Sequence, residues 1–361
     1  MEIFDVAVVG GGPAGSTCSA FCAASGLRTL LIEREKFPRE KVCGDCLNPE
    51  CWPILRRLGV DQRVRALPHG ALDWVEFINV SDLRLRIDLP RGENAEIAIK
   101  RSAFDSILLE RAREVGAEVC DASTLTSIEK SDGAWKLTTR EVTAAFRARV
   151  LVGADGRNST VARLLGLLPH IAKERVALQA HVPLPRGFGN RVVLQLLPGG
   201  YSGQAPVNDT ELNLCLVGRP KSIRVLQDWA SHHFELALKQ TWRTITPLTR
   251  SALHPAQENV LFVGDAARVV EPFTGEGIFY ALRSGELAAA AAKEMIRGNA
   301  AEAVRDYIRQ HRAMYRGRLW INALARAAVV SPGLGAVFFQ LARLQPALLG
   351  LLTREIVTAK L

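Results

Sequence analysis

Apolar and polar residues recur with two different periods along this chain, and the periods separate strands from helices. Continuous apolar runs at residues 3–9 and 28–33 predict buried strands, and residues 14–25 between them predict a helix. Residues 103–115 repeat apolar positions on one helical face. The chain therefore begins with a compact β-α-β unit.

The middle of the chain follows the two-residue period of strands. Apolar and charged residues alternate over 83–89, which predicts a half-buried strand paired with residues 74–80. Runs at 176–182, 192–197 and 212–217 predict further strands. We expect these segments to form an inserted antiparallel sheet.

Short strands and helices return in the later part of the chain. Residues 135–139 and 144–149 predict a hairpin, and residues 149–154 and 259–264 predict short buried strands that each end in a Gly–Asp element. From Gly277 onward the pattern is almost entirely helical.

A glycine-rich loop joins the first strand to the first helix. Gly10 permits a tight turn, Gly12 lets the backbone approach a pyrophosphate, and Gly15 lets helix and strand pack closely. Glu33, at the end of the next strand, is expected to accept hydrogen bonds from the hydroxyl groups of a ribose. A merely glycine-rich turn is the alternative, but the strand, loop, helix and acidic residue together predict FAD or NAD rather than NADP.

Two later motifs decide between these cofactors. Asp155-Gly156 and Gly264-Asp265 follow the first loop in order, and Arg101 stands three residues before Phe104-Asp105. With these motifs the sequence resembles the FAD-dependent para-hydroxybenzoate hydroxylase superfamily. It is most similar to the geranylgeranyl-reductase-like branch, which lies near the flavin halogenases. The resemblance covers residues 3–290 and implies FAD as cofactor.

The resemblance also implies which residues bind FAD. Asp265 would bind a ribityl hydroxyl, Arg101 the pyrophosphate, and the backbone at Leu125 the adenine. The N–H groups at Gly275 and Gly277, which open a helix over 278–296, would approach the flavin pyrimidine. The complete predicted cofactor site is Gly10, Gly12, Pro13, Ala14, Gly15, Glu33, Arg34, Lys41, Cys43, Gly44, Arg101, Leu125, Asp155, Asp265, Pro272, Gly275, Gly277 and Ile278. For Asp155 alone, a turn-forming role is the alternative.

Residues 37–49 resemble the family's Lys–x–Cys–Gly–Gly segment, which passes beside the flavin ring. Arg39 and Lys41 are placed to meet phosphate or a nicotinamide cofactor. Asp45 and Cys46 stand where glycines are common in relatives. Cys43 is a weak catalytic candidate, and a packing role is favoured over a Cys43–Cys46 disulfide relay.

The predicted substrate half departs from the reductase branch. Tyr201 and Pro206 fit its Tyr–x–Trp–x–Phe–Pro motif, but Gly203 and Ala205 replace the two large aromatic residues. The change implies a roomier cavity and counts against prenyl reduction. Tyr201 is a second weak catalytic candidate that orients substrate, or it is a sheet-packing tyrosine. The tryptophan-halogenase motif is missing, and no residue pattern predicts a metal site.

Two segments near the C-terminus have a distinctive composition. Residues 307–328 are basic and amphipathic, and residues 334–352 are very apolar. They are expected to cap the substrate cavity or pack on the protein, with peripheral membrane contact as the alternative. No signal peptide is visible, so a cytoplasmic location is expected, either free or at a membrane.

The composition limits the kinds of partner that this protein is expected to bind. The 361 residues include 46 Lys and Arg against 37 Asp and Glu, a net charge of +9. Aromatic residues make up only 6%, which gives no stacking platform for nucleic acid. Seven cysteines in a chain of this length do not form a disulfide framework. Part of the charge is expected near the FAD phosphates, and much of the rest at residues 305–326.

The sequence thus predicts an α/β fold, with a Rossmann-like FAD-binding domain, an inserted antiparallel-sheet substrate domain and C-terminal helices. The FAD-binding domain is expected at 1–72, 101–168 and 256–300, the substrate domain at 73–100 and 169–255, and the helical cap at 301–361.

The predicted function is that of an FAD-dependent monooxygenase acting on a small aromatic or apolar substrate through a flavin C4a-hydroperoxide. Such an enzyme uses O2 and NADH or NADPH as electron donor. An ene reductase of the geranylgeranyl-reductase type is one alternative. A flavoprotein maturation factor acting on a peptide or carrier-bound substrate is another, because the positive charge would suit an acidic partner.

Overall fold

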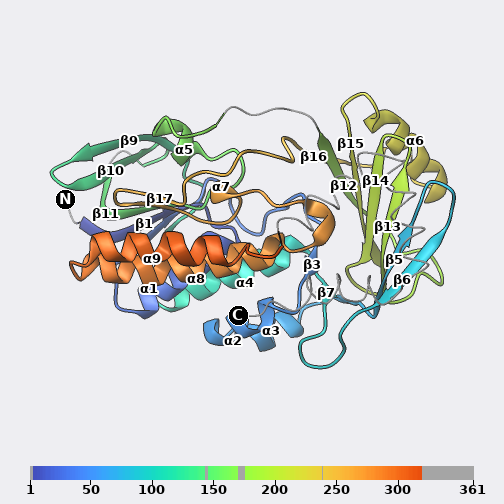
Figure 1. Ribbon diagram of the computed structural model, residues 1–361, viewed down its shortest axis with the longest axis horizontal. Coiled ribbons are helices and arrows are strands. Elements are labelled where there is room, and N and C mark those ends of the chain that lie inside the picture. Colours follow the sequence, from blue (N-terminus) through green and yellow to red (C-terminus); the bar gives the residue numbers. More distant parts are fainter. Residues whose placement is uncertain (1–2, 143–144, 170–174, 238, 319–361) are drawn as a thin grey trace.

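A computed structural model describes residues 3–142, 145–169, 175–237 and 239–318. Its two large sheets stand side by side along the long axis of the molecule (Figure 1). The first and last segments of the described chain build one sheet, and the segments between them build the other. The predicted α/β architecture with an inserted sheet is confirmed.

The first sheet has eight strands with a parallel centre. Strand β1 (Ile3–Val9) lies between β2 (Thr29–Ile32) and β11 (Phe146–Gly153), and pairs parallel with both. Its other strands are β8 (Glu118–Cys120), β9 (Leu125–Ser131), β10 (Ala134–Thr139), β17 (Ala256–Gln257) and β18 (Val260–Phe262). The runs predicted as buried strands are buried because helices and the β9–β10 hairpin leave little of this sheet open to water.

Four long helices run along one side of this sheet (Figure 1). They are α1 (Pro13–Ala24), α4 (Arg101–Glu114), α8 (Gly277–Ile296) and α9 (Ala300–Ala313). Helices α1 and α8 approach closely at Gly285, where an added Cβ would come within 2.3 Å of the Ala14 carbonyl oxygen. The shorter helices are α2 (Cys51–Leu58), α3 (Asp61–Arg65), α5 (Thr160–Leu164), α6 (Ile223–His233) and α7 (Gly264–Ala267).

The second sheet has seven strands, in the order β16-β12-β15-β14-β13-β5-β6. Their bounds are β5 (Trp74–Ile78), β6 (Arg84–Asp88), β12 (Val176–Pro183), β13 (Arg191–Leu197), β14 (Gly200–Pro206), β15 (Glu211–Gly218) and β16 (Arg243–Ile245). The predicted β5–β6 pair is confirmed as antiparallel, but β13 and β5 run parallel. The prediction of a purely antiparallel sheet is therefore wrong at this pair. No hairpin joins these two distant segments, so a turn does not impose their direction.

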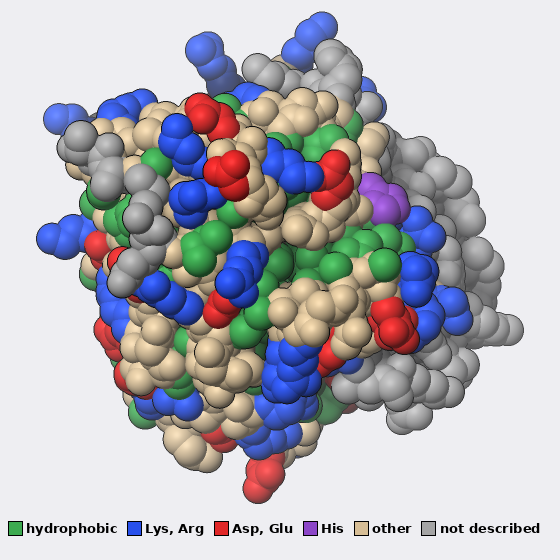
Figure 2. Space-filling view, turned by 90° about the vertical axis from the view of Figure 1, so that its left-hand side faces the viewer, with side chains coloured by type: hydrophobic (Ala, Val, Ile, Leu, Met, Phe, Trp, Pro, Cys, Tyr) green, Lys and Arg blue, Asp and Glu red, His purple; other side chains and the backbone are tan. Residues whose placement is uncertain are grey.

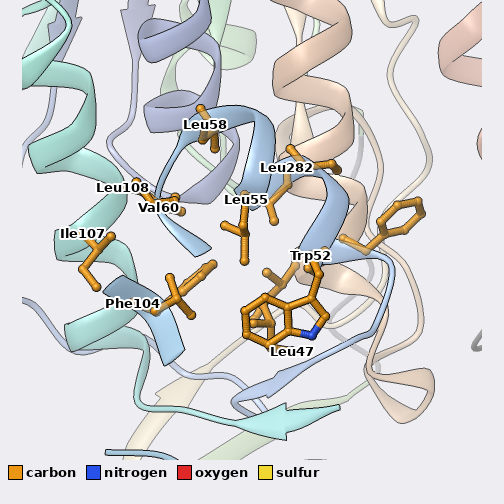
Figure 3. Close-up of a cluster of buried hydrophobic side chains, with 14 of the residues drawn as sticks. Leu47, Trp52, Leu55, Leu58, Val60, Phe104, Ile107, Leu108 and Leu282 are labelled. Carbon is orange, nitrogen blue, oxygen red and sulfur yellow. The ribbon is translucent and has the colours of Figure 1, made fainter. Parts of the chain in front are cut away.

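A small third sheet connects the two large ones. It consists of β3 (Cys46–Leu47), β7 (Ile97–Ala98) and β4 (Gly70–Ala71). At Gly70 an added Cβ would lie 1.8 Å from the Pro206 carbonyl oxygen, so only glycine allows β4 to reach the end of β14. Behind this sheet, Leu47 and Trp52 pack with Leu55 and Phe104 in a buried apolar cluster (Figure 3).

Charged side chains of both signs are interspersed on the face that carries β9 and β10 (Figure 2). Several of them pair there: Lys136 with Glu129 at 3.2 Å, and Arg147 with Asp132 at 3.3 Å. These ion pairs offset part of the positive charge on this face.

The helix predicted at 278–296 is confirmed as α8, whereas the segment predicted at 307–328 begins inside α9. The apolar segment 334–352 and most of the predicted cap lie outside the described residues. Within the described ranges, no helix is both long and apolar enough to cross a bilayer.

Candidate active site

A cavity of about 950 Å³ extends from the β1–α1 loop to the inner face of the seven-stranded sheet. That volume is at the upper end of the range for ligand sites. All the predicted cofactor-site residues except Gly15 line it. At one side its walls are glycine-rich and charged, and at the other they are aliphatic.

The β1–α1 loop needs its glycines for separate reasons. Gly10 has φ +107°, and a Cβ there would lie 2.5 Å from the Ala154 carbonyl oxygen. A Cβ on Gly15 would lie 1.8 Å from the Gly10 carbonyl oxygen. Gly12 faces the cavity, and the nearest atom to a Cβ there would be the Arg39 guanidinium, 3.5 Å away. The turn and packing roles predicted for Gly10 and Gly15 are confirmed, and Gly12 leaves its backbone open to a ligand.

Glu33 holds this loop from the end of β2. Its Oε2 accepts a hydrogen bond from the Gly11 N–H at 2.6 Å, and its Oε1 accepts one from the Glu35 N–H at 2.8 Å. Glu33 is only 6% exposed, yet it lines the cavity. Each carboxylate oxygen accepts more than one hydrogen bond, so Glu33 can also meet a ribose hydroxyl. Arg34 and Leu125 form the neighbouring wall.

The Asp155 carboxylate accepts hydrogen bonds from residues that follow it in the chain. Oδ1 accepts from the Ser159 hydroxyl at 2.6 Å, and Oδ2 accepts from the backbone N–H of Thr160 at 2.6 Å and of Val161 at 3.0 Å. These bonds satisfy N–H groups at the start of α5. The turn-forming interpretation of this motif is therefore correct for the side chain, although the residue also lines the cavity.

A group of cations surrounds Asp265. The Arg157 guanidinium lies 2.9 Å from Asp265 Oδ2, and Lys41 and Arg39 line the same wall. Burial and the nearby charges of Arg157 and Arg101 lower the pKa of Lys41 to about 8. An anion here would offset this repulsion between cations, so the wall fits the phosphates of a dinucleotide.

Arg101 is paired with a carboxylate of its own helix. Its guanidinium forms two hydrogen bonds with Asp105, at 2.7 and 2.8 Å, and Arg39 lies 3.1 Å from the same carboxylate. The Asp105 charge raises the pKa of Arg101, against the effect of burial. Arg101 lines the cavity, but its charge is directed at Asp105, and its contact with pyrophosphate stays a prediction.

The Cys43–Cys46 loop is fastened to the second sheet. The Cys43 carbonyl oxygen accepts from Asn213 Nδ2 at 3.0 Å and from the Cys215 thiol at 3.2 Å. Asp45, in the left-handed region at φ +60°, lies within the loop, and its Oδ2 is 2.9 Å from His181 Nε2. Burial raises the pKa of Asp45 to about 6, although His181 opposes the shift.

The loop leaves open space beside Gly44, where an added Cβ would meet no atom within 4 Å. Cys43 and Cys46 are free thiols, and burial raises the pKa of both. Protonated thiols are poor nucleophiles. This environment favours the packing interpretation over a disulfide relay.

The start of α8 forms another part of the wall. Pro272, Gly275, Gly277 and Ile278 line the cavity, and no atom lies within 4 Å of a Cβ added at Gly277. The free N–H groups and positive dipole of a helix N-terminus favour an electron-rich ligand edge. The Glu276 side chain contacts Arg318 and accepts from the Tyr280 hydroxyl at 3.2 Å.

The inner face of the seven-stranded sheet supplies the aliphatic side of the cavity. Tyr201 is buried there, and its ring packs edge-on against Phe273 at 5.3 Å between centroids. Next to it, a Cβ on Gly203 would be 3.7 Å from its nearest neighbour, so a methyl group there would make ordinary van der Waals contact. The apolar lining residues are Val75, Phe77, Leu85, Ile87, Leu89, Ala177, Val192, Leu194, Leu196, Ala205, Val217, Ile245 and Leu248.

Three features of the site were not predicted. Arg157 directly follows the Asp155-Gly156 motif, so its position was a usable signal. Asp45 and His181 do not belong to a common sequence motif, and Glu96, which also lines the cavity, belongs to none of the family's motifs. An acidic residue between apolar neighbours, as in Ala95-Glu96-Ile97, was the only local sign.

Comparison with known proteins agrees with this geometry. Residues 4–183 match the family model described as an FAD binding domain. The chain is a flavoprotein with an FAD-binding domain. The glycine loop, Glu33 and the cationic wall are the parts of this flavoprotein that fit the cofactor.

Curated relatives align over most of this flavoprotein. Conditioned medium factor receptor 1 of Dictyostelium discoideum is 30% identical, over 80% of this chain and 63% of the receptor. Menaquinone reductase of Mycolicibacterium smegmatis is 29% identical, over 79% of this chain and 75% of the reductase. Digeranylgeranylglycerophospholipid reductase of Thermoplasma volcanium is 27% identical, over 83% and 80% of the two chains.

Solved structures share the fold of this flavoprotein. The flavin-dependent brominase Bmp2 is 22% identical, with a TM-score of 0.80 over 99% of this chain and 94% of the brominase. PqsL of Pseudomonas aeruginosa, described as "a probable FAD-dependent monooxygenase", is 18% identical, with a TM-score of 0.79 over 94% and 100% of the two chains.

Proposed function

We propose that this flavoprotein reduces a carbon–carbon double bond in an apolar substrate, with NADH or NADPH as the electron donor. The observation that carries this proposal is the continuity of the cavity from the dinucleotide loop to an aliphatic sheet face. FAD bound in this cavity would accept and donate hydride.

Separate parts of the chain would hold the cofactor. The backbone at Gly12 and the start of α1 would meet the phosphates, with Lys41 and Arg157 adding positive charge. Glu33 would hold the ribose of the adenosine, and Asp265 a ribityl hydroxyl. Gly277, at the start of α8, would face the flavin ring with free N–H groups.

Other residues that line the cavity would bind the substrate and supply a proton to it. The aliphatic face excludes water and orients an apolar chain without competing hydrogen bonds. Reduction of a double bond consumes a proton as well as a hydride. Asp45 holds a proton over part of the acidic to neutral range, and His181 connects it to the sheet.

The curated relatives support a reductase, since two of them bear the names menaquinone reductase and digeranylgeranylglycerophospholipid reductase. The second candidate is the monooxygenase that the sequence predicts. Gly203 and Ala205 favour it, because they replace the large aromatic residues of the reductase motif and widen the cavity. In both cases the substrate would be small and apolar or aromatic, and no nucleic acid would be involved.

One experiment separates the two reactions. The purified holoprotein is reduced with NADH or NADPH without oxygen, and is then mixed anaerobically with a polyprenyl alkene or with menaquinone. Return of the oxidised flavin spectrum supports reduction if the polyprenyl product is two mass units heavier, or if the menaquinone product stays two mass units heavier after its quinol ring has been reoxidised by air. If the spectrum returns only with oxygen, and the product gains one oxygen atom, the monooxygenase is supported and reduction is refuted.

A further inference from the structure

The Glu96 carboxyl group lies in the cavity wall without a protein partner. The residue is 9% exposed and lines the cavity, and within the described ranges it has no hydrogen bond or ion pair. Leaving a buried polar group without a hydrogen bond costs folding free energy. A group of this kind on the wall of a ligand cavity is available to a ligand.

The backbone on both sides of Glu96 is firmly held. The Ala95 carbonyl oxygen accepts a hydrogen bond from the Trp52 indole at 2.8 Å, and Trp52 belongs to the buried cluster of Figure 3. Ile97 pairs with Leu47 across β7 and β3. Glu96 is therefore presented by a rigid element, as binding residues often are.

An apolar cluster begins beside the carboxyl group, at Cys46. Cys46 packs against the buried cluster of Leu72, Leu89, Ala98, Val192, Ala205 and Val207. Burial, together with the Glu96 charge, raises the pKa of the Cys46 thiol and of the Cys51 thiol, so these titratable neighbours are uncharged. Burial alone raises the pKa of Glu96, to about 7.

A second polar side chain lies across from Glu96. Because Leu47 pairs with Ile97 in antiparallel strands, Asn48 stands opposite Glu96, and both residues line the cavity. The Asn48 Oδ1 accepts from the Glu50 N–H at 2.9 Å, which fixes the amide and leaves its N–H groups for another acceptor.

We propose that Glu96, assisted by Asn48, binds an uncharged hydrogen-bonding group, a hydroxyl or a carbonyl oxygen, on the otherwise apolar substrate. This assignment deepens the proposed function and rests on the same cavity. A carboxyl group that changes protonation near neutral pH accepts a hydrogen bond from a hydroxyl when ionised, and donates one to either kind of oxygen when protonated. The site would thus orient one end of the substrate while the aliphatic face binds the rest.

The test compares two probes that differ in one donor, geraniol and geranyl methyl ether. Their dissociation constants for the holoprotein are measured from the change in flavin fluorescence at pH 8.5 and pH 5.5. At pH 8.5 we expect geraniol to bind about tenfold more tightly, because only its hydroxyl donates to the carboxylate. At pH 5.5 the difference should shrink, because the protonated acid donates to both oxygens.

Three variants locate the effect. Glu96→Leu should bind both probes equally at both pH values, and Glu96→Gln should remove the pH dependence because an amide does not ionise. Glu93→Gln is the matched control, since Glu93 lies in the same segment but is exposed, and it should behave as the wild type. Equal binding of both probes by the wild type at pH 8.5, or a difference that survives in Glu96→Leu, would overturn the assignment.

The binding measurement requires no turnover, so it separates this proposal from the proposed function. If the expected pattern appears but no alkene is reduced, the assignment of Glu96 stands and the reduction fails. If alkenes are reduced while Glu96→Leu shows unchanged probe binding, the reduction stands and the assignment fails. Tighter binding of geranylamine than of geraniol, dependent on Glu96, would show a cationic ligand and refute an uncharged one.

Discussion

The Nε2 atom of His181 on β12 lies 2.9 Å from the buried Oδ2 of Asp45, 136 residues earlier in the chain. Together with the bonds from Asn213 and Cys215 to the Cys43 carbonyl oxygen, this contact fastens the Cys43–Cys46 loop to the seven-stranded sheet. The loop that lies beside the cofactor cavity is therefore positioned by the substrate sheet. A substitution in the sheet should affect the position of the loop, and a substitution in the loop should affect the sheet.

Removal of the imidazole should weaken this connection. In His181→Leu, Asp45 loses its main hydrogen-bond partner, and we expect a loss of about 2 kcal/mol in the free energy of unfolding. The pKa of Asp45 should rise above about 6, because His181 now lowers it. Urea unfolding and a pH titration of the flavin absorbance would measure the two effects. His181→Gln, which keeps a donor, should lie closer to the wild type, and identical behaviour of both variants would contradict this role.

The buried Glu96 should make the protein less stable as the pH rises. Its pKa is raised from 4.5 to about 7, so the folded state binds more protons than the unfolded state between these values. The contribution to stability is complete below pH 4.5 and is lost as the pH rises through 7. At pH 8, Glu96→Gln should therefore be more stable than the wild type by on the order of 3 kcal/mol.

Urea unfolding at pH 4.5 and pH 8 checks this prediction, with Glu93→Gln as the exposed control. A gain of the same size at both pH values would show that the effect is not linked to ionisation of Glu96.

Two substitutions in the glycine loop should have different effects, one on folding and the other on FAD binding. Gly15→Ala places a Cβ 1.8 Å from the Gly10 carbonyl oxygen, so the loop and α1 cannot keep their packing, and soluble folded protein should be lost. Gly12→Ala meets only the flexible end of Arg39 at 3.5 Å and should fold. Because Gly12 faces the cavity, that variant should carry at least tenfold less FAD affinity. Circular dichroism and the flavin-to-protein ratio measure both outcomes, and full flavin content in Gly12→Ala would be inconsistent with the assigned loop.

A large side chain at Gly203 should shrink the substrate side without disturbing the cofactor side. Gly203 and its neighbours Leu194 and Cys215 line the cavity, and a Cβ at Gly203 would contact these two side chains without a clash. Gly203→Trp should keep its flavin and lower the affinity for long prenyl chains more than for short ones. The KM for substrates of increasing length would show this, with Gly203→Ala as the control. An unchanged KM, or the same loss for all lengths, would contradict the placement of Gly203 beside the substrate chain.

Much of the cofactor side was readable from the sequence because its requirements are local. A left-handed turn at Gly10 and close packing at Gly15 follow from the lack of a Cβ, and Glu33 stands at the end of the strand that follows. The helix over 278–296 and the strand pair β5–β6 also follow from periodicity within one segment. The family motifs then placed Asp155 and Asp265 at the same cavity.

The tertiary structure decided the rest. The parallel pairing of β5 with β13, the Asp45–His181 contact and the proximity of Glu96 to Cys46 all join segments that are distant in sequence. Arg101 has its charge directed at Asp105, although the motif alone suggested a phosphate. Such contacts depend on how whole sheets pack, and the pKa of a carboxyl group depends on the burial that results. The sequence by itself determined the backbone turns of the dinucleotide loop, because steric limits act between neighbouring residues. Only the tertiary structure determined which carboxyl groups are buried away from water and which of them have a hydrogen-bond or ion-pair partner.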